Sequence, residues 1–169
     1  MSRILLADDS PHAQRMGARI LGEEGFEVIT ATDGETALLR LAQADPQILL
    51  VDVSLPGRSG YQICEFVKGH PEHRHRRVVL LGSLLDAIDQ TEAARVGADA
   101  FLEKPLEASA VLETVRRLAA VTALTTPSGE VDPEQVRAAV TLAVDAAMPA
   151  LIDEITARVL AALQQKRDA

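Results

Sequence analysis

The stretch ILLVD, residues 48–52, decides the fold of this chain. Four consecutive apolar residues lead into an acid, and an apolar run without alternation is typical of a strand that is buried on both faces of a parallel sheet. Similar runs occur as ILLA at 4–7 and VVLL at 78–81, and less apolar or shorter segments occur as EVITA at 27–31 and AFL at 100–102. We therefore expect five short strands.

A segment with helical periodicity follows each of these runs. Ser10 and Pro11 have the residue types that are preferred at a helix N-cap and at the first helical position. Further helices are expected around residues 37–41, 61–68, 86–96 and 107–120, and Gly97 is expected to end the fourth helix. Five strand–helix units in succession predict an α/β fold, a doubly wound five-stranded parallel sheet with helices on both faces.

Composition excludes several classes of protein. The chain has 169 residues, of which 47% are apolar, enough for one globular domain with an appendage. Its net charge of −8 argues against a protein that coats DNA or RNA, and no apolar run reaches the roughly 18 residues of a membrane span. With no signal-peptide pattern at the start, we expect a cytoplasmic protein. We interpret the single cysteine, Cys64, as a structural thiol.

Charged residues stand where the predicted strands end. Asp8 and Asp9 follow the first strand, and Asp52 ends the third. Because ligands of parallel α/β sheets bind at the carboxyl ends of the strands, these carboxylates are expected to share a pocket, and hard oxygen ligands suit Mg²⁺. Lys104 follows the fifth strand and would add a positive charge there, which makes a phosphoryl-acceptor site plausible. The alternative is that these acids are solvated loop residues.

Three segments carry a resemblance to a known family: ILLADDS at the start, ILLVDVSLPGRSGYQIC in the middle and GADAFLEKP near residue 100. Together they resemble the receiver domain of two-component response regulators, of the kind found in chemotaxis regulators, over residues 1–121. The resemblance implies a flavodoxin-like fold with Asp52 as the phosphoacceptor. It also implies Mg²⁺ as the cofactor, held directly by Asp9, mostly through water by Asp8, and by the backbone carbonyl of Ser54.

The resemblance assigns further roles around the fifth strand. Lys104 would hold the phosphoryl group, and Pro105 would follow a cis peptide bond. Phe101 matches the aromatic residue whose side chain turns inward on activation. The alternative interpretation of Phe101 is a plain core aromatic.

One position departs from the family pattern. Receivers place a Thr or Ser at the end of the fourth strand, where its hydroxyl binds the phosphoryl group and pulls the following loop into the active conformation. Counting back from Lys104 places Gly82 there, with Ser83 one residue later. Either a shift of one residue brings Ser83 into position, or the hydroxyl is missing.

The residues after the expected receiver form two further segments. Residues 122–130 are rich in turn formers and are expected to be a linker. Residues 131–167 are expected to form an amphipathic helical extension, one helix kinked at Pro149 or two helices. Its apolar stripe could pack on the receiver, dock on a partner or pair with a second copy, and we favour a homodimer. Seven acids against four basic residues from Ala123 onward make direct DNA binding unexpected.

The leading hypothesis is therefore a response regulator that accepts a phosphoryl group on Asp52 from a sensor histidine kinase and signals to a downstream protein. Such a receiver catalyses its own phosphorylation and is not a metabolic enzyme. A pseudo-receiver that acts as a constitutive scaffold is the alternative that Gly82 favours. An aspartate-nucleophile phosphatase is disfavoured because Ser54 stands where a second Asp is needed, and no Gly-rich phosphate loop supports nucleotide binding.

Overall fold

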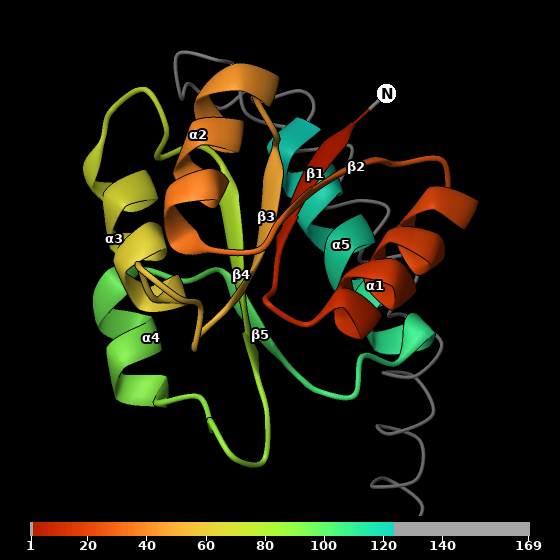
Figure 1. Ribbon diagram of the computed structural model, residues 1–169. Coiled ribbons are helices and arrows are strands. Elements are labelled where there is room, and N and C mark those ends of the chain that lie inside the picture. The colour runs from red at the N-terminus through yellow and green to blue at the C-terminus, as the bar shows by residue number, and fades with distance from the viewer. Residues whose placement is uncertain (1, 124–169) are drawn as a thin grey trace, which may run out of the picture. The chain divides into compact units, whose positions relative to one another are not determined.

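A computed structural model describes residues 2–123 and contains one parallel sheet of five strands in the order β2-β1-β3-β4-β5 (Figure 1). The strands are β1 (Arg3–Ala7), β2 (Glu27–Ala31), β3 (Ile48–Asp52), β4 (Arg77–Gly82) and β5 (Ala100–Glu103). The central pair β1 and β3 is in register from Ile4 opposite Ile48 to Ala7 opposite Val51. The predicted doubly wound five-stranded parallel sheet is confirmed.

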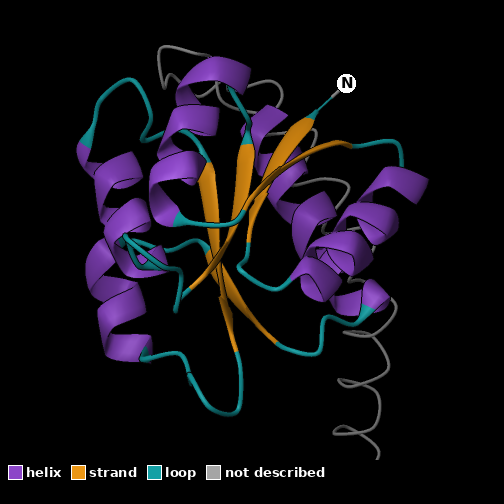
Figure 2. Ribbon diagram, viewed as in Figure 1, coloured by secondary structure: helices purple, strands orange, loops and turns teal. Residues whose placement is uncertain are grey.

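Helices cover both faces of the sheet (Figure 2). They are α1 (Pro11–Glu23), α2 (Gly34–Ala44), α3 (Gly60–Gly69), α4 (Gln90–Val96) and α5 (Ala108–Ala123). Helices α2, α3 and α4 lie on one face, and α1 and α5 lie on the other (Figure 1). This arrangement leaves the carboxyl ends of the strands free of helices, so the loops that follow the strands meet there.

The strands bury side chains on both faces, as the unbroken apolar runs predict. In β3, Leu49 and Val51 belong to the core under α2 and α3, whereas Ile48 and Leu50 belong to the core under α1 and α5. All four side chains are fully buried. These four successive side chains of β3 therefore point alternately to opposite faces of the sheet, but all of them are apolar, as is typical of a central parallel strand.

Four of the five helices begin close to where the sequence predicts. The Ser10 hydroxyl accepts a hydrogen bond from the Ala13 N–H at 3.4 Å and Pro11 is the first residue of α1, as expected. Gly97 ends α4 with a φ of 77°, also as expected. The predicted start of α4 near Asp86 is wrong, because Asp89 is the N-cap and the preceding residues form a loop.

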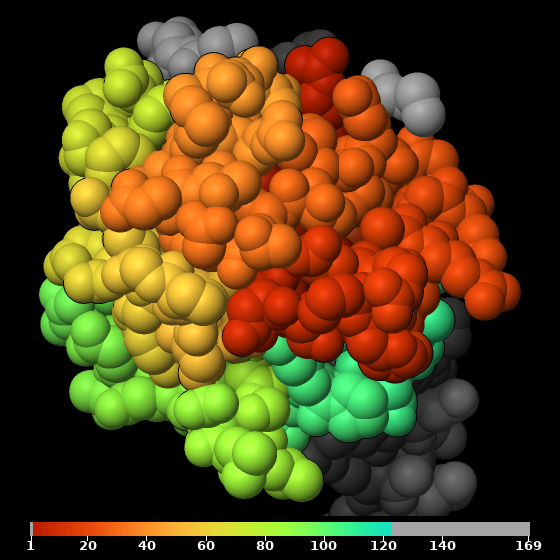
Figure 3. All heavy atoms as spheres, in the orientation of Figure 1, coloured from red at the N-terminus to blue at the C-terminus, as the bar shows by residue number. Residues whose placement is uncertain are grey.

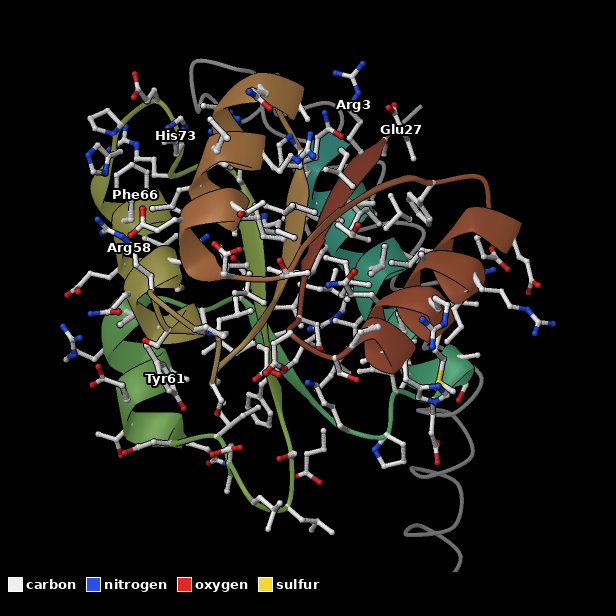
Figure 4. All side chains as sticks on the ribbon, viewed as in Figure 1. Arg3, Glu27, Arg58, Tyr61, Phe66 and His73 are labelled. Carbon is white, nitrogen blue, oxygen red and sulfur yellow. The ribbon has the colours of Figure 1, made fainter. Side chains whose placement is uncertain are left out.

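The edge of the sheet opposite the carboxyl ends is held by an ion pair between β1 and β2. Arg3 Nε lies 3.0 Å from Glu27 Oε2, and the two residues are direct partners in the strand register (Figure 4). Both side chains are about half exposed, so the pair contributes little to stability.

None of the helices between residues 2 and 123 combines the length and hydropathy that crossing a bilayer requires. The predicted extension, 131–167, and the predicted linker, 122–130, lie outside the described residues, except for Thr122 and Ala123 at the end of α5.

Candidate functional site: an acidic pocket at the carboxyl edge of the sheet

The sheet brings together three carboxylates that the sequence separates widely. Asp8 and Asp9 follow β1, and Asp52 is the last residue of β3, the neighbour of β1 in the sheet. One carboxylate oxygen from each residue lies within 4.8 Å of those from the other two. Asp8 is fully buried and Asp52 is 6% exposed, whereas Asp9 is exposed. The interpretation of these acids as unrelated solvated loop residues is therefore wrong.

Backbone amides orient the two buried carboxylates. Asp8 Oδ1 accepts a hydrogen bond from the Ser10 N–H at 2.9 Å, and Asp52 Oδ1 accepts one from the Ser54 N–H at 2.8 Å. Each acid thus bonds to the second residue after it, which closes the loop over the end of its strand. The other oxygen of each carboxylate faces the pocket.

Lys104 supplies the positive charge in this pocket. Its Nζ lies 2.6 Å from Asp8 Oδ2 and also forms an ion pair with Asp52 Oδ2. Burial alone would lower the pKa of Lys104, but hydrogen bonds and charge interactions with Asp52 and Asp8 raise it above its ordinary value. The ammonium therefore stays charged at neutral pH and partly offsets the repulsion between the two carboxylates.

The loops at this edge pack tightly, and Gly60 allows one close approach. A Cβ at Gly60 would lie 2.5 Å from the carbonyl oxygen of Asp52, so only glycine lets the start of α3 pass the end of β3. This contact fixes the backbone that carries the Asp52 carboxylate.

The donor set fits a hard divalent cation. Three carboxylates offer only oxygen ligands, and among residues 2–123 the fully buried Asp8 Oδ2 has no partner besides the Lys104 ammonium. Oxygen ligands in this number, with room for water on the exposed Asp9 side, suit Mg²⁺ better than a softer metal.

The end of β4 differs from the arrangement in which a hydroxyl faces the pocket. A Cβ at Gly82 would lie 2.4 Å from Cγ1 of Ile88, so the Ile88 side chain fills the space where a larger residue would project. The Ser83 hydroxyl accepts a hydrogen bond from the Asp86 N–H at 3.1 Å, and the Ser83 N–H donates to the Asp86 carbonyl at 3.0 Å. Ser83 therefore closes a turn within the loop 83–89.

This loop is also held at its far end, by a residue that sequence reasoning missed. The Asp89 N–H donates a hydrogen bond to the Tyr61 hydroxyl at 2.8 Å, and Tyr61 points from α3 toward the segment before α4 (Figure 4). Asp89 Oδ1 in turn caps the Thr91 and Glu92 amides. No local signal in the sequence links residues 61 and 89, which are 28 positions apart.

Phe101 and Pro105 lie on either side of Lys104. The Phe101 side chain is 48% exposed, so its interpretation as a plain core aromatic is wrong. The peptide bond between Lys104 and Pro105 is cis, as the resemblance implies.

An apolar groove of about 390 Å³ opens beside Lys104. Its walls include Met16, Leu106 and the two leucines of the loop 83–89. Leu84 is 95% exposed and Leu85 is 94% exposed. The β4–α4 loop that carries them projects at the lower edge of the face in Figure 3, where it is coloured yellow-green.

Cys64 lies away from this site. Its side chain is fully buried, and its thiol faces the Val96 carbonyl at 3.5 Å. Burial raises the pKa of the Cys64 thiol to about 12, so it is neutral at physiological pH, in agreement with a structural thiol.

The fold and this pocket together define a receiver domain, and comparison with known proteins agrees. The family model described as "Response regulator receiver domain" matches residues 4–116, so the chain belongs to the response regulator receiver family. It is thus a receiver of two-component signalling, a regulatory domain and not a classical enzyme.

Particular relatives show how far the similarity extends. Protein PilG of Pseudomonas aeruginosa is 32% identical over 114 residues, which cover 68% of this chain and 84% of PilG. Response regulator PleD of Caulobacter vibrioides is 38% identical over 117 residues, 69% of this chain, but the match spans only 26% of PleD. Among solved structures, the chemotaxis response regulator CheY4 of Vibrio cholerae has a TM-score of 0.64 at 28% identity, with 70% of this chain and 98% of that chain covered.

Proposed function

We propose that Asp52 accepts a phosphoryl group from a histidine kinase and that this transfer controls the output of the protein. One observation carries the proposal: a single pocket holds Asp52 together with two further carboxylates and the ammonium group of Lys104, which follows a different strand. This combination provides a nucleophile, a cation site and a positive charge for the transferred group.

Each residue has a distinct part in the reaction. A carboxylate oxygen of Asp52 attacks the phosphorus of a phosphohistidine, a new P–O bond forms, and the P–N bond breaks, so that the imidazole leaves with the electron pair. The Lys104 ammonium, already between Asp8 and Asp52, moves to an oxygen of the phosphoryl group. The Ser54 N–H keeps Asp52 oriented during attack.

The cation site is part of the same proposal. Asp8, Asp9, Asp52 and the backbone carbonyl of Ser54 would hold Mg²⁺. When bound, Mg²⁺ would neutralise charge on the transferred phosphoryl oxygens. The donor set supports this assignment to Mg²⁺, because the three acids offer only oxygen atoms and one ligand atom per acid lies within 4.8 Å of the others.

The apolar groove beside Lys104 supports a protein as the donor. Two nearly fully exposed leucines line the same groove as Lys104 and are unfavourable in water, and a donor protein that brings its phosphohistidine to Asp52 would cover them. The histidine kinase is accordingly the partner that we expect to contact this groove.

The output would pass through the loop 83–89 and Phe101 to surfaces that bind a downstream protein or a second copy of the chain. The switch residues are then Gly82, Ser83, Phe101 and Pro105. Self-association would use the extension at 131–167, for which the sequence alone provides support.

The second candidate function is a constitutive scaffold, and the contact between Ile88 and Gly82 favours it. Gly82 has no hydroxyl, Ile88 fills the space beside it, and the Ser83 oxygen already accepts a hydrogen bond from the Asp86 N–H within the loop 83–89. A loop held in this way could keep one conformation whether or not Asp52 is phosphorylated.

Intact mass tests both candidates. The wild type and Asp52→Asn are incubated with Mg²⁺ and either a small phosphodonor or a purified histidine kinase with ATP. The gain of one phosphoryl group by the wild type alone is the expected result. No gain by the wild type with either donor, under conditions where Mg²⁺ binding is measured directly, would contradict the receiver reaction and favour the scaffold.

A further inference from the structure

Gln14 on α1 connects two strands at the edge of the acidic pocket. Its side-chain nitrogen Nε2 donates to the Asp8 carbonyl at 2.5 Å and to the Ala31 carbonyl at 3.2 Å. These two oxygens lie at the ends of neighbouring strands, β1 and β2. The Gln14 amide therefore bridges the strand ends from outside the sheet.

The bridge occurs where the pairing of the strands stops. The last main-chain bond between them runs from the Asp8 N–H to the Ala31 carbonyl at 3.0 Å. The Asp8 carbonyl comes after this bond, and no main-chain donor between residues 2 and 123 bonds to it. The Gln14 side chain takes the place of the missing donor, as a buried carbonyl requires.

The Asp8 carbonyl belongs to the peptide unit that joins Asp8 to Asp9. Its orientation therefore decides in which direction the Asp9 side chain leaves the main chain. Within residues 2–123, no hydrogen bond or ion pair involves the exposed Asp9 carboxylate. The position of that carboxylate thus depends on its backbone, whereas those of Asp8 and Asp52 are also fixed through their own side chains.

A role in building the helix does not explain this side chain. The first turn of α1 already has the Ser10 cap and Pro11 at its start, and the Gln14 N–H donates to the Ser10 carbonyl at 3.0 Å in the ordinary helical way. The side-chain amide is thus not needed to form α1, and both of its hydrogen bonds go to acceptors outside the helix.

We infer that Gln14 is a positioning residue for the cation site: by holding the peptide between Asp8 and Asp9, it places the Asp9 carboxylate for Mg²⁺. This inference rests on the proposed function, because it assumes that the three carboxylates hold Mg²⁺. It adds a residue that touches neither the cation nor the phosphoryl group. Partners that orient metal ligands in this way typically contribute about 10-fold or more to affinity.

The test is Mg²⁺ binding by isothermal titration calorimetry on the full chain, with Gln14→Met. Methionine keeps the length and helix propensity of glutamine but has no N–H donor. We expect the Kd for Mg²⁺ to rise about 10-fold. Gln43→Met is the matched control, because Gln43 is an exposed glutamine of α2 far along the chain from the pocket, and its Kd should stay at the wild-type value.

A second variant separates positioning from a general effect on stability. Gln14→Arg restores N–H donors while adding a positive charge, which by itself opposes cation binding. We expect its Kd to lie below that of Gln14→Met. Unfolding in EDTA is measured for every variant, and a Gln14→Met protein that loses stability but binds Mg²⁺ like the wild type would overturn the inference.

Phosphorylation by the small donor gives an independent readout. With Gln14→Met, the Mg²⁺ concentration for half-maximal rate should rise, while the rate at saturating Mg²⁺ should stay near that of the wild type. An equal fall of the rate at all Mg²⁺ concentrations would overturn the positioning role. Failure of the wild type to be phosphorylated, with Gln14→Met still weaker in calorimetry, would contradict the proposed function and leave the assignment of Gln14 intact.

Discussion

At the scale of single residues, Lys104 holds the acidic pocket together in the absence of a cation. Its ammonium lies between Asp8 and Asp52, two carboxylates that are nearly inaccessible to water. Carboxylates in such surroundings repel one another more strongly than on the surface, because water screens them less. The receiver fold is therefore stabilised at this point by the same residue that we propose to contact the phosphoryl group.

We predict that Lys104→Met lowers the free energy of unfolding in EDTA by about 3 kcal/mol, the usual cost of removing one partner of a buried ion pair. Added Mg²⁺ should recover much of this loss, since a cation that binds only the folded state stabilises it. The pKa of Lys104 is raised in the folded protein. Its charge therefore stabilises the fold fully at pH values below its ordinary pKa, and this stabilisation is lost as the pH rises through the raised pKa. Urea unfolding at pH 7 with and without Mg²⁺ measures both effects.

Lys68→Met is the matched control. The Lys68 side chain is 19% exposed, as that of Lys104 is, and its Nζ lies 2.6 Å from Asp99 Oδ2. This variant should also lose stability, but Mg²⁺ should not restore it, because Asp99 lies outside the acidic pocket. Equal recovery of both variants by Mg²⁺ would show that the cation acts elsewhere.

The sequence predicts some of these residues and not others, for physical reasons. Asp8, Asp9 and Asp52 follow apolar runs, and parallel strands have their carboxyl ends at one edge, so their meeting follows from topology. Gln14 gives no such signal, because a glutamine on an amphipathic helix is usually solvated. Its partners are carbonyls of the main chain, which every residue has.

At the scale of elements, the loop 83–89 between β4 and α4 is the least typical part of the receiver. The Ser83–Asp86 turn holds one end, and the bond from Asp89 to Tyr61 holds the other. Between them, Ile88 packs on the bare Cα of Gly82. Gly82 is thus needed for space, and not for an unusual backbone angle.

A double-mutant cycle tests this packing. We predict that Gly82→Ala lowers the free energy of unfolding by about 2 kcal/mol, because the new methyl group overlaps Ile88. In the background of Ile88→Ala the same change should cost far less, so that the coupling between the two sites exceeds about 1 kcal/mol. Chemical denaturation of the four proteins gives the coupling directly.

Gly22→Ala serves as the control for the cycle. A Cβ at Gly22, in α1, meets nothing within 4 Å, so alanine should leave stability equal or raise it through its helix propensity. Additive costs of Gly82→Ala and Ile88→Ala would show that the loop 83–89 moves away without strain and does not depend on this contact.

The start of α4 illustrates why element boundaries are hard to predict. Asp86 and Asp89 are equally good N-cap residues in the sequence, three positions apart. The choice between them is made by tertiary contacts, since Ser83 binds the Asp86 amide and Tyr61 binds the Asp89 amide. Neither contact can be predicted from the helix propensity of the local sequence.

At the scale of the whole molecule, residues 4–118 supply both cores of the receiver. One core lies under α2, α3 and α4, and the other under α1 and α5. Continuous apolar runs fix the strands, and right-handed crossovers limit their order, which is why the sheet is predictable from sequence. The conformation of exposed side chains such as Phe101 cannot be predicted from sequence in this way, because neither burial nor strand pairing specifies it.

We predict that the full chain self-associates and that a chain ending at Ala123 does not. Residues 4–118 supply a core on each face of the sheet, whereas the apolar stripe predicted for 131–167 favours pairing between copies. Multi-angle light scattering should give twice the monomer mass for the full chain and the monomer mass for the shorter one. Monomers in both samples would contradict a dimer that uses this extension.

The strand order also has a consequence for how the chain is made. A ribosome delivers Asp8, Asp9 and Asp52 early, and the central strands β1 and β3 can pair as soon as residue 52 has emerged. The ammonium that neutralises these acids comes 52 positions later, after the last strand. A nascent chain that has not yet reached β5 therefore has these acids without the Lys104 ammonium, and their negative charge favours the approach of that lysine once it is made.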